Sequence, residues 1–207
     1  DAYALMHLHG RGSSFIRPGD FCSYAAMLAK SGSKASLDRL EALGGNLADF
    51  HRKDPAYQLA AHAVSYAAAT SRGDAQAAAQ AYAGMRQTLA AARTSGLEVD
   101  RDQSMFVLEA AAAMKDEQTA CAVAGMLYDD HIGNQSVEDR IQEVMAGGGW
   151  KRQAADIAAG ASENLRRMNA AAADMAKHGR LLEAVEEFAR LAETNRNVAV
   201  YLNAATC

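Results

Sequence analysis

Apolar residues recur at helical spacing along most of the chain, and short polar or glycine-containing breaks separate the stretches that they form. Runs of β-branched residues are scarce, and no apolar–polar alternation reaches the length of a β-strand. The 207 residues contain only two prolines, which leaves long uninterrupted segments. The pattern therefore predicts an all-α protein of roughly ten helices, each about 10 to 18 residues long, joined by short turns.

Five breaks predict the turns between paired helices. They lie at residues 32, 73, 115, 149 and 179, and all of these are glycine except Lys115. Aspartates stand where they can cap three of the following helices: Asp20 before a helix over 21–30, Asp54 before Pro55, and either Asp100 or Asp102.

The last third of the chain carries the clearest pair of amphipathic helices. Over 165–177 one face is formed by Leu165, Met168, Ala172 and Met175. After Gly179 a second face is formed by Leu181, Ala184, Val185, Phe188 and Leu191. Because a short turn joins them, we expect the two helices to pack as an antiparallel hairpin.

A similar arrangement follows the other turns. A small residue comes five positions after the turn and other apolar residues follow it: Ala184, Phe188 and Leu191; Ala78, Tyr82 and Met85; Ala120, Ala124 and Leu127; Ala154, Ala158 and Ala161. Small residues let two helices cross closely, and a larger residue one turn later fills the space beside them. The first hairpin fits least, because Leu37 and Glu41 occupy the corresponding positions.

A longer repeat is also present. Met168-Asn169-Ala170-Ala171-Ala172 recurs as Leu202-Asn203-Ala204-Ala205-Thr206, with a period of 34 residues (203 − 169). With the hairpin spacing, this resembles the tetratricopeptide repeat (TPR) family, which implies a right-handed superhelix of antiparallel hairpins. The turns are unevenly spaced and the usual proline is missing. A generic α-solenoid or irregular bundle is therefore the alternative.

The expected organisation is one continuous domain from a longer protein. Residues 1–134 form an irregular hairpin region that is TPR-like from about 55, and 135–207 form the C-terminal TPR-like hairpins. A narrower resemblance covers 135–207. The run Ser162–Asn169, the hairpin ending at Phe188 and the run Val200–Ala205 look like the tail of bacterial response regulators, which carry TPR repeats after a CheY-like phospho-receiver domain. It implies a signalling output module whose receiver would precede Asp1.

Composition narrows the functional classes. A net charge of −4 creates no basic field, so we expect no direct binding to nucleic acid. No apolar run reaches the ~18–20 residues of a membrane span, and no secretory signal opens the chain. An odd number of widely spaced cysteines, Cys22, Cys121 and Cys207, favours free thiols in a cytoplasmic protein.

Candidate chemistry is sparse. His7 and His9 have no nearby Cys, Asp or Glu to complete a metal site. Asp129-Asp130-His131 is typical of a helix C-terminus, where histidine complements the helix dipole. The sequence thus predicts no catalytic residue, no metal and no cofactor.

The TPR resemblance implies a binding surface instead. In such arrays the first helix of each hairpin lines a concave face, and an asparagine there can bind a peptide backbone or terminal carboxylate. Asn169 and Asn203 match that position, and Arg166 and Lys177 are expected to share the surface. The alternative is that both asparagines bond the backbone of a neighbouring hairpin.

These features predict a non-catalytic protein–protein interaction scaffold that binds a protein or peptide. Two alternatives remain open. One is a self-assembly scaffold, such as a homodimer. The other is a ligand-sensing helical domain of a transcriptional regulator, which requires an enclosed apolar pocket near Met105, Phe106 and Met126.

Overall fold

The computed structural model describes residues 17–50, 54–95, 99–131 and 134–194. Within these ranges every regular element is an α-helix, which confirms the predicted all-α class. The chain forms two compact units, Asp1–Met114 and Lys115–Cys207. This division differs from the one expected at 134 and 135, which distinguished regions by their repeat character.

The first unit contains α2 (Pro18–Ser31), α3 (Lys34–Phe50), α4 (Pro55–Arg72), α5 (Ala75–Thr94) and α6 (Arg101–Ala113). Helix α4 is central, because α2, α3, α5 and α6 all contact it. Its fully buried residues Leu59, Ala60, Ala63 and Val64 form the middle of the core. The small side chains of α4 and α5 let these two helices run close together along their length.

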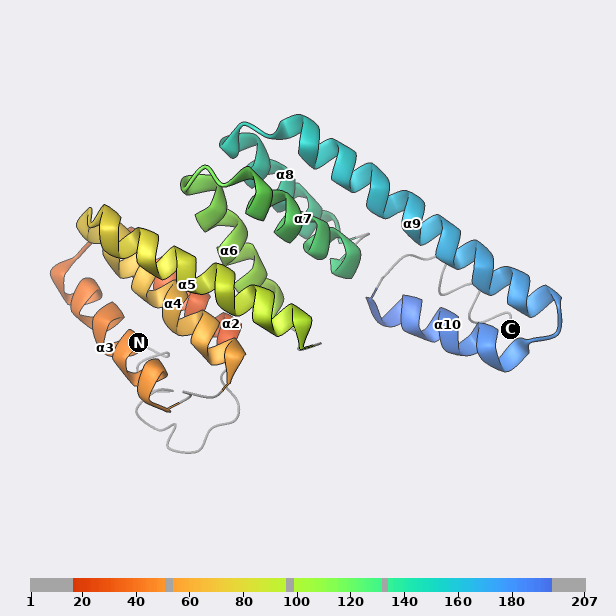
Figure 1. Ribbon diagram of the computed structural model, residues 1–207, viewed down its shortest axis with the longest axis horizontal. Helices are drawn as coiled ribbons and strands as arrows, with labels where there is room; N and C mark the ends of the chain where they lie inside the picture. The colour runs from red at the N-terminus through yellow and green to blue at the C-terminus, as the bar shows by residue number, and fades with distance from the viewer. Residues whose placement is uncertain (1–16, 51–53, 96–98, 132–133, 195–207) are drawn as a thin grey trace. The chain divides into compact units, whose positions relative to one another are not determined.

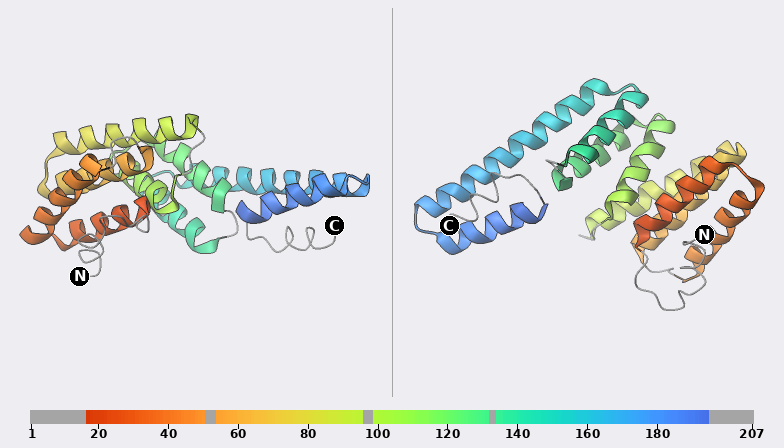
Figure 2. Two further views of the ribbon diagram at one scale, coloured as in Figure 1. Left: turned by 90° about the horizontal axis from the view of Figure 1, so that it is seen from below. Right: turned by 180° about the vertical axis from the view of Figure 1, so that it is seen from behind.

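The second unit contains α7 (Glu117–His131), α8 (Gln135–Gly148), α9 (Lys151–Lys177) and α10 (Leu181–Thr194). Figures 1 and 2 show α7 and α8 beside the N-terminal part of α9 and α10 beside its C-terminal part. A small core joins α9 to α10 through the buried Ala172, Ala184, Phe188 and Leu191. The predicted antiparallel hairpin is thereby confirmed.

All five predicted turn positions adopt the left-handed backbone conformation. The φ angles are 59° at Gly32, 72° at Gly73, 58° at Lys115, 98° at Gly149 and 77° at Gly179. Glycine adopts this conformation without steric cost, and it ends a helix by turning the chain away. Among the described residues no other has a positive φ.

The spacing after the turns identified most of the core residues correctly, although Ala158 of α9 is only half-buried. Ala78, Tyr82 and Met85 are buried in α5, as are Ala120, Ala124 and Leu127 in α7. The residues after the first turn do not follow this spacing of small and large buried residues, as expected. Leu37 is half-buried, and Glu41 is exposed and forms an ion pair with Arg72 of α4.

Two of the three predicted caps are confirmed. Asp54 Oδ1 accepts a hydrogen bond from Ala56 N at 2.9 Å, and Asp100 Oδ1 accepts one from Asp102 N at 2.8 Å. The prediction for Asp20 is wrong, because α2 begins at Pro18 rather than at residue 21. Asp20 lies inside the first turn, where its Oδ2 accepts from Arg17 N at 3.0 Å.

Helix α9 is longer than predicted. Helices of about 10 to 18 residues were expected, but α9 has 27 residues and includes the whole segment 165–177. Helix α5, with 20 residues, also exceeds the expected length. Alanine-rich sequence without proline propagates a helix readily, and Gly160 alone does not stop it.

The predicted packed face of α10 is also only partly correct. Ala184, Phe188 and Leu191 are buried, but Leu181 is 49% exposed and Val185 is 40% exposed. Helix α9 covers only one side of α10, so the part of the predicted face that Leu181 and Val185 form is open to solvent. The right-handed superhelix stays a prediction.

Candidate functional site

Three of the four predicted binding residues lie on α9. Arg166 and Lys177 are exposed, and Asn169 between them is half-buried. At about 100° per residue, the three side chains fall within about 80° of one another around the helix axis. They therefore form one elongated surface, called here the polar strip. Asn203, the fourth predicted residue, lies outside the described residues.

The position of the polar strip follows from the packing of α9. Ala172 is fully buried against α10, and Leu165, Met168 and Ala176 pack around it. Asn169 lies beside this packed row. It is displaced from the row in the direction in which the helix turns from its N-terminus to its C-terminus. The core contact with α10 thus determines which way the strip faces.

The charge of the polar strip is partly balanced within α9. Arg166 Nη1 lies 3.0 Å from Glu163 Oε2, and both side chains are about two-thirds or more exposed, at 74% and 68%. An exposed pair of this kind is worth little, because solvent screens it. The guanidinium can therefore exchange Glu163 for a carboxylate of a partner at small cost.

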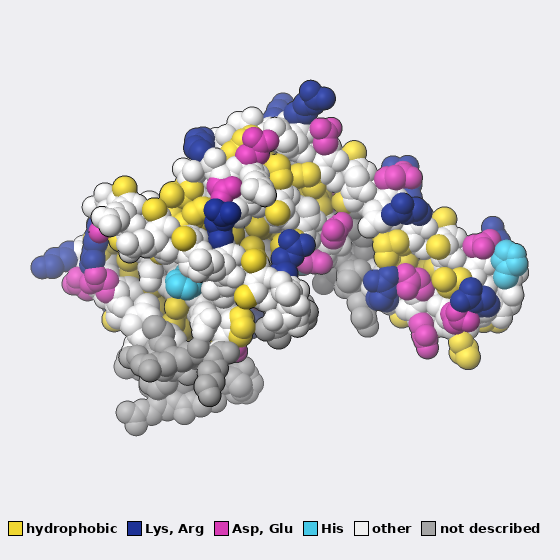
Figure 3. All heavy atoms as spheres, in the orientation of Figure 1, with side chains coloured by type: hydrophobic (Ala, Val, Ile, Leu, Met, Phe, Trp, Pro, Cys, Tyr) yellow, Lys and Arg dark blue, Asp and Glu magenta, His cyan; other side chains and the backbone are white. Residues whose placement is uncertain are grey.

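A second surface, the apolar strip, lies on α10. Leu181, Leu182, Val185 and Ala189 are all exposed, and Leu182 is 81% exposed. Each helix has a row of side chains that packs against the other helix, and each strip lies next to that row in the direction in which the helix turns. Because α9 and α10 are antiparallel, the two strips lie on the same face of the hairpin. The polar strip and the apolar strip therefore adjoin on that face. Figure 3 shows apolar and charged side chains interspersed over this hairpin.

Other candidate chemistry finds no support in geometry. Within the described ranges, no three His, Cys, Asp or Glu side chains lie where they could share a metal ion. His7 and His9 lie outside those ranges. Asp129 and Asp130 are exposed at the end of α7, where His131 is the last residue, as expected.

The described cysteines, Cys22 and Cys121, are free. Burial raises the pKa of the Cys22 thiol, and the nearby carboxylates of Asp100 and Asp102 raise it further. A protonated, buried thiol is a poor nucleophile. Among the described helices, none combines the length and apolar character that crossing a bilayer requires.

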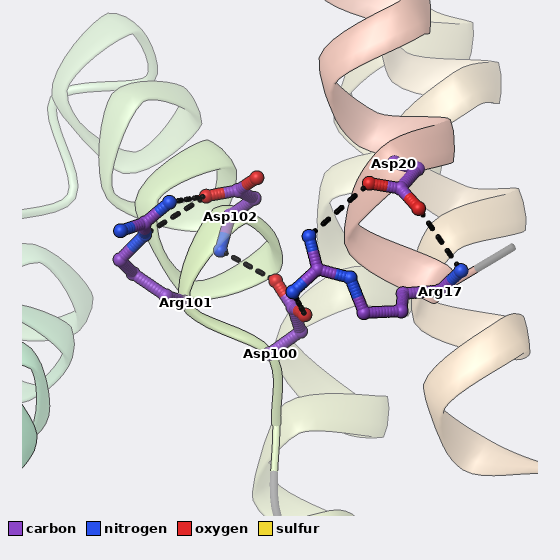
Figure 4. Close-up of polar contacts among 5 residues, drawn as sticks. All are labelled: Arg17, Asp20, Asp100, Arg101 and Asp102. Atoms are coloured by element: carbon purple, nitrogen blue, oxygen red, sulfur yellow. Dashed lines mark hydrogen bonds and ion pairs between the residues drawn. The ribbon is translucent and has the colours of Figure 1, made fainter. Parts of the chain in front are cut away.

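Sequence reasoning missed a charged cluster between the first turns of α2 and α6 (Figure 4). Arg17 Nη1 lies 3.7 Å from Asp100 Oδ2, while its Nη2 donates to Asp20 Oδ1 at 3.4 Å. The carboxylate of Asp100, then that of Asp20, raises the pKa of the Arg17 guanidinium. The cluster links two helix starts that are more than eighty residues apart in sequence (100 − 17 = 83), so no local pattern could reveal it.

Aromatic rings of α4, α5 and α6 lie close to one another around Tyr66, next to the half-buried Phe106. Phe106 meets Tyr66 edge-on with ring centroids 6.3 Å apart, and Tyr66 lies 6.4 Å from Tyr82. The Tyr66 ring of α4 therefore occupies the space on one side of Phe106, which counts against an enclosed ligand pocket at that residue.

Comparisons with known proteins add no family. No protein-family model matches the sequence, and neither the search of curated proteins nor that of solved structures finds a match. The resemblances to TPR proteins and to response-regulator tails therefore stay predictions from the residues.

Proposed function

We propose that this chain is a non-catalytic scaffold that binds a protein or peptide partner through the polar strip of α9. The observation that carries the proposal is the exposure of Arg166 and Lys177 near the half-buried Asn169, on a side of α9 next to the residues that pack against α10. A rigid helix that presents donors in a fixed row suits the recognition of an extended chain.

The chemistry of the strip indicates what a partner must supply. The amide of Asn169 offers a donor and an acceptor together, which matches a peptide group. Arg166 and Lys177 offer only donors and positive charge, so they favour carboxylates, including a chain terminus. The partner is thus an extended, acidic or carboxylate-ending segment.

The resemblance noted above adds a context to the proposal. The scaffold acts in the cytoplasm of a bacterium as the output or docking module of a response-regulator type of signalling protein. In its support, the small and large residues that follow the turns at 73, 115 and 179 are buried, as TPR-like hairpins require. Binding there positions a partner without covalent chemistry.

The test compares matched substitutions on α9. A partner is captured by chemical crosslinking in a bacterial lysate, purified, and titrated calorimetrically against the full chain. Arg166→Ala and the double change Asn169→Ala with Asn203→Ala are expected to weaken binding at least tenfold. Arg152→Ala is the control, since Arg152 is also exposed on α9 and faces Asp156 at 3.8 Å. Equal affinities for all variants, with helicity intact, would exclude the polar strip.

A further inference from the structure

The apolar strip of α10 has a regular spacing along the helix axis. Leu181, Val185 and Ala189 follow one another at i, i+4 and i+8, so neighbours in this row lie about 6 Å apart at 1.5 Å per residue. All three side chains are exposed. In an extended chain, side chains on one side occur at every second residue, about 6.6 Å apart. The row on α10 therefore matches alternate side chains of an extended segment.

The α9 side of the same face carries positive charge. Arg166 and Lys177 are 11 residues apart (177 − 166), which is about 16.5 Å along the helix. Because a short turn joins α9 to the antiparallel α10, Lys177 lies near the level of Leu181. At an equal rise along both helices, Arg166 lies about 4 to 5 Å beyond the level of Ala189. One cation thus stands near each end of the apolar row.

The carboxylates of α10 do not lie between these cations and the apolar row. Glu183 and Glu187 are on the other side of α10, where each bonds an arginine of the same hairpin. Glu186 borders the strip on its outer side, beyond Leu182, and so lies away from α9. The seam, defined here as the line where the polar strip and the apolar strip meet, is positive along one edge and apolar along the other.

We propose that the partner of the scaffold binds along the seam as an extended segment of about seven residues in which acidic and apolar side chains alternate. The inference rests on the proposed function and names the chemistry of its partner. Successive side chains of an extended chain point to opposite sides. Three apolar side chains therefore contact Leu181, Val185 and Ala189. The acidic side chains between and beyond them face α9, where the outermost ones meet Lys177 and Arg166.

A partner helix suits the seam less well. An α-helix is about 10 to 12 Å wide, so it would lay a single apolar stripe against both edges. On the α9 edge that stripe would meet the charges of Arg166 and Lys177 in place of apolar side chains. An extended chain is about 5 Å wide and directs different side chains to the two edges. The unlike edges of the seam therefore favour the extended form.

The size of the apolar strip also favours a short segment over a second copy of the chain. A stable dimer buries about 1,600 Å² in total, whereas one side of a 14-residue helix about 21 Å long offers a small part of that. Seven extended residues span about 20 Å from first to last, which equals the length available.

Three peptides of one composition test the alternating pattern. Each contains four glutamates and three valines, has blocked ends and carries a fluorescent label. One alternates the two residue types, one places the glutamates in a block before the valines, and one spaces the valines at i, i+3 and i+4 as in an amphipathic helix. We expect the full chain to bind the alternating peptide at least tenfold more tightly than the other two in anisotropy titrations. Equal affinities, or tightest binding of the helical arrangement, would overturn the proposal.

Substitutions on the hairpin test the two edges of the seam. Val185→Asp places a carboxylate in the apolar row and Arg166→Ala removes a cation, so each is expected to weaken binding of the alternating peptide at least tenfold. Ala171→Asp is the matched control for the added charge. Ala171 is exposed on α9 and lies about 140° around the helix from Arg166, so affinity should change less than twofold. Circular dichroism checks that each variant keeps its helicity.

The same variants separate this inference from the proposed function. If Arg166→Ala weakens binding of the captured partner and of the alternating peptide while Val185→Asp weakens neither, the polar strip binds charge alone. The proposed function then stands and the alternating segment is excluded. If neither substitution changes either affinity, both are excluded.

A photo-crosslink distinguishes the occupants of the apolar strip. Leu182→p-benzoylphenylalanine places the reactive group at the most exposed of the large apolar residues described, which is 81% exposed. Illumination of the full chain with the alternating peptide is expected to join one chain to one peptide. A crosslink between two chains in its place would assign the strip to a second copy, and a crosslink within one chain would assign it to the chain's own residues. Either result would overturn the proposal.

Discussion

The ring of His62 in α4 lies directly over Gly84 in α5. A Cβ atom at Gly84 would come within 2.5 Å of His62 Cε1 and 2.6 Å of its Nδ1. No side chain fits there unless the ring moves, so Gly84 allows the close approach of the two central helices of the first unit.

We predict that the effect of Gly84→Ala depends on His62. Alanine stabilises a helix interior by about 1 kcal/mol relative to glycine, but displacing the ring costs about 0.5 to 1.5 kcal/mol. In the native sequence the substitution should therefore be neutral or mildly destabilising. In a His62→Ala background it should raise the free energy of unfolding by about 1 kcal/mol.

Urea denaturation followed by circular dichroism checks this double-mutant cycle. Gly45→Ala is the control, because Gly45 lies inside α3 and a Cβ there would meet nothing within 4 Å. It should be stabilising in both backgrounds. An identical gain from Gly84→Ala with and without His62 would show that the ring does not restrict this site.

The same histidine predicts a pH dependence. Burial lowers the pKa of His62 below its ordinary value of 6.5. The unfolded chain therefore binds the proton first, and stability falls as the pH drops below about 6.5, then levels off below the folded pKa. Removing the ring with His62→Gln should flatten this part of the stability profile. His178→Gln, which removes an exposed histidine, should leave it in place.

Lys115 is the one described non-glycine residue with a positive φ, at 58°. The left-handed conformation costs an ordinary residue about 1 to 2 kcal/mol, and glycine almost nothing. Lys115→Gly is thus expected to raise stability by about 1 kcal/mol in thermal or urea unfolding. Lys151→Gly is the matched control, since Lys151 is an exposed lysine in the first turn of α9 and glycine should destabilise it. A loss of stability from Lys115→Gly would contradict the conclusion that the left-handed backbone at Lys115 is strained.

Turn positions could be predicted because they depend on local chemistry. Gly32, Gly73, Gly149 and Gly179 each follow a run of helix-forming residues, and glycine at such a point favours the left-handed conformation. Even Lys115 was identified, because the spacing of Ala120 and Leu127 after it matched the glycine turns.

Helix continuity and helix coverage could not be predicted in this way. The expected helix lengths of about 10 to 18 residues did not allow for α9, which runs for 27 residues because neither proline nor a left-handed glycine interrupts it. The apolar spacing of Leu181 and Val185 matched that of Phe188, and spacing alone cannot say which of them a neighbour covers.

The candidate site was predictable only in part. Arg166 and Lys177 are exposed, as a surface role requires, and periodicity placed them near Asn169. The packing of His62 on Gly84 and the contacts of Arg17 join residues far apart in sequence. Such contacts depend on how the helices pack, which a single sequence does not specify.

The crossing of α9 and α10 predicts a sharp contrast between adjacent alanines. Ala172 is fully buried at the crossing, whereas Ala171 is exposed. Ala172→Leu overpacks the contact and should destabilise the hairpin by about 1 to 3 kcal/mol. Ala171→Leu should stay within about 0.5 kcal/mol of the native chain. Hydrogen exchange of the α10 amides measures both, and equal rates in the two variants would argue against a close crossing.

The last prediction concerns Gln103, which is fully buried in the first turn of α6. Its Nε2 donates to the carbonyl oxygen of Ala56 in α4 at 2.7 Å, but its Oε1 has no hydrogen-bond partner among the described residues. A buried acceptor left unpaired costs about 1 to 3 kcal/mol, while the one bond contributes about 0.5 to 1.5 kcal/mol. Gln103→Met keeps the length of the side chain and removes both the unpaired acceptor and the hydrogen bond. It should therefore be neutral or stabilising by up to about 2 kcal/mol.

Gln103→Glu provides the opposite test at the same position. It buries a carboxylate near Asp100 and Asp102, so at pH 7 it should destabilise the first unit by several kcal/mol. Acid pH protonates the carboxyl group and should restore part of the loss, because the penalty falls on the charged form. Urea denaturation at pH 7 and pH 4.5 separates the two variants. If Gln103→Met instead lost more than about 2 kcal/mol, Oε1 would have to be satisfied by a bound water that the substitution displaces.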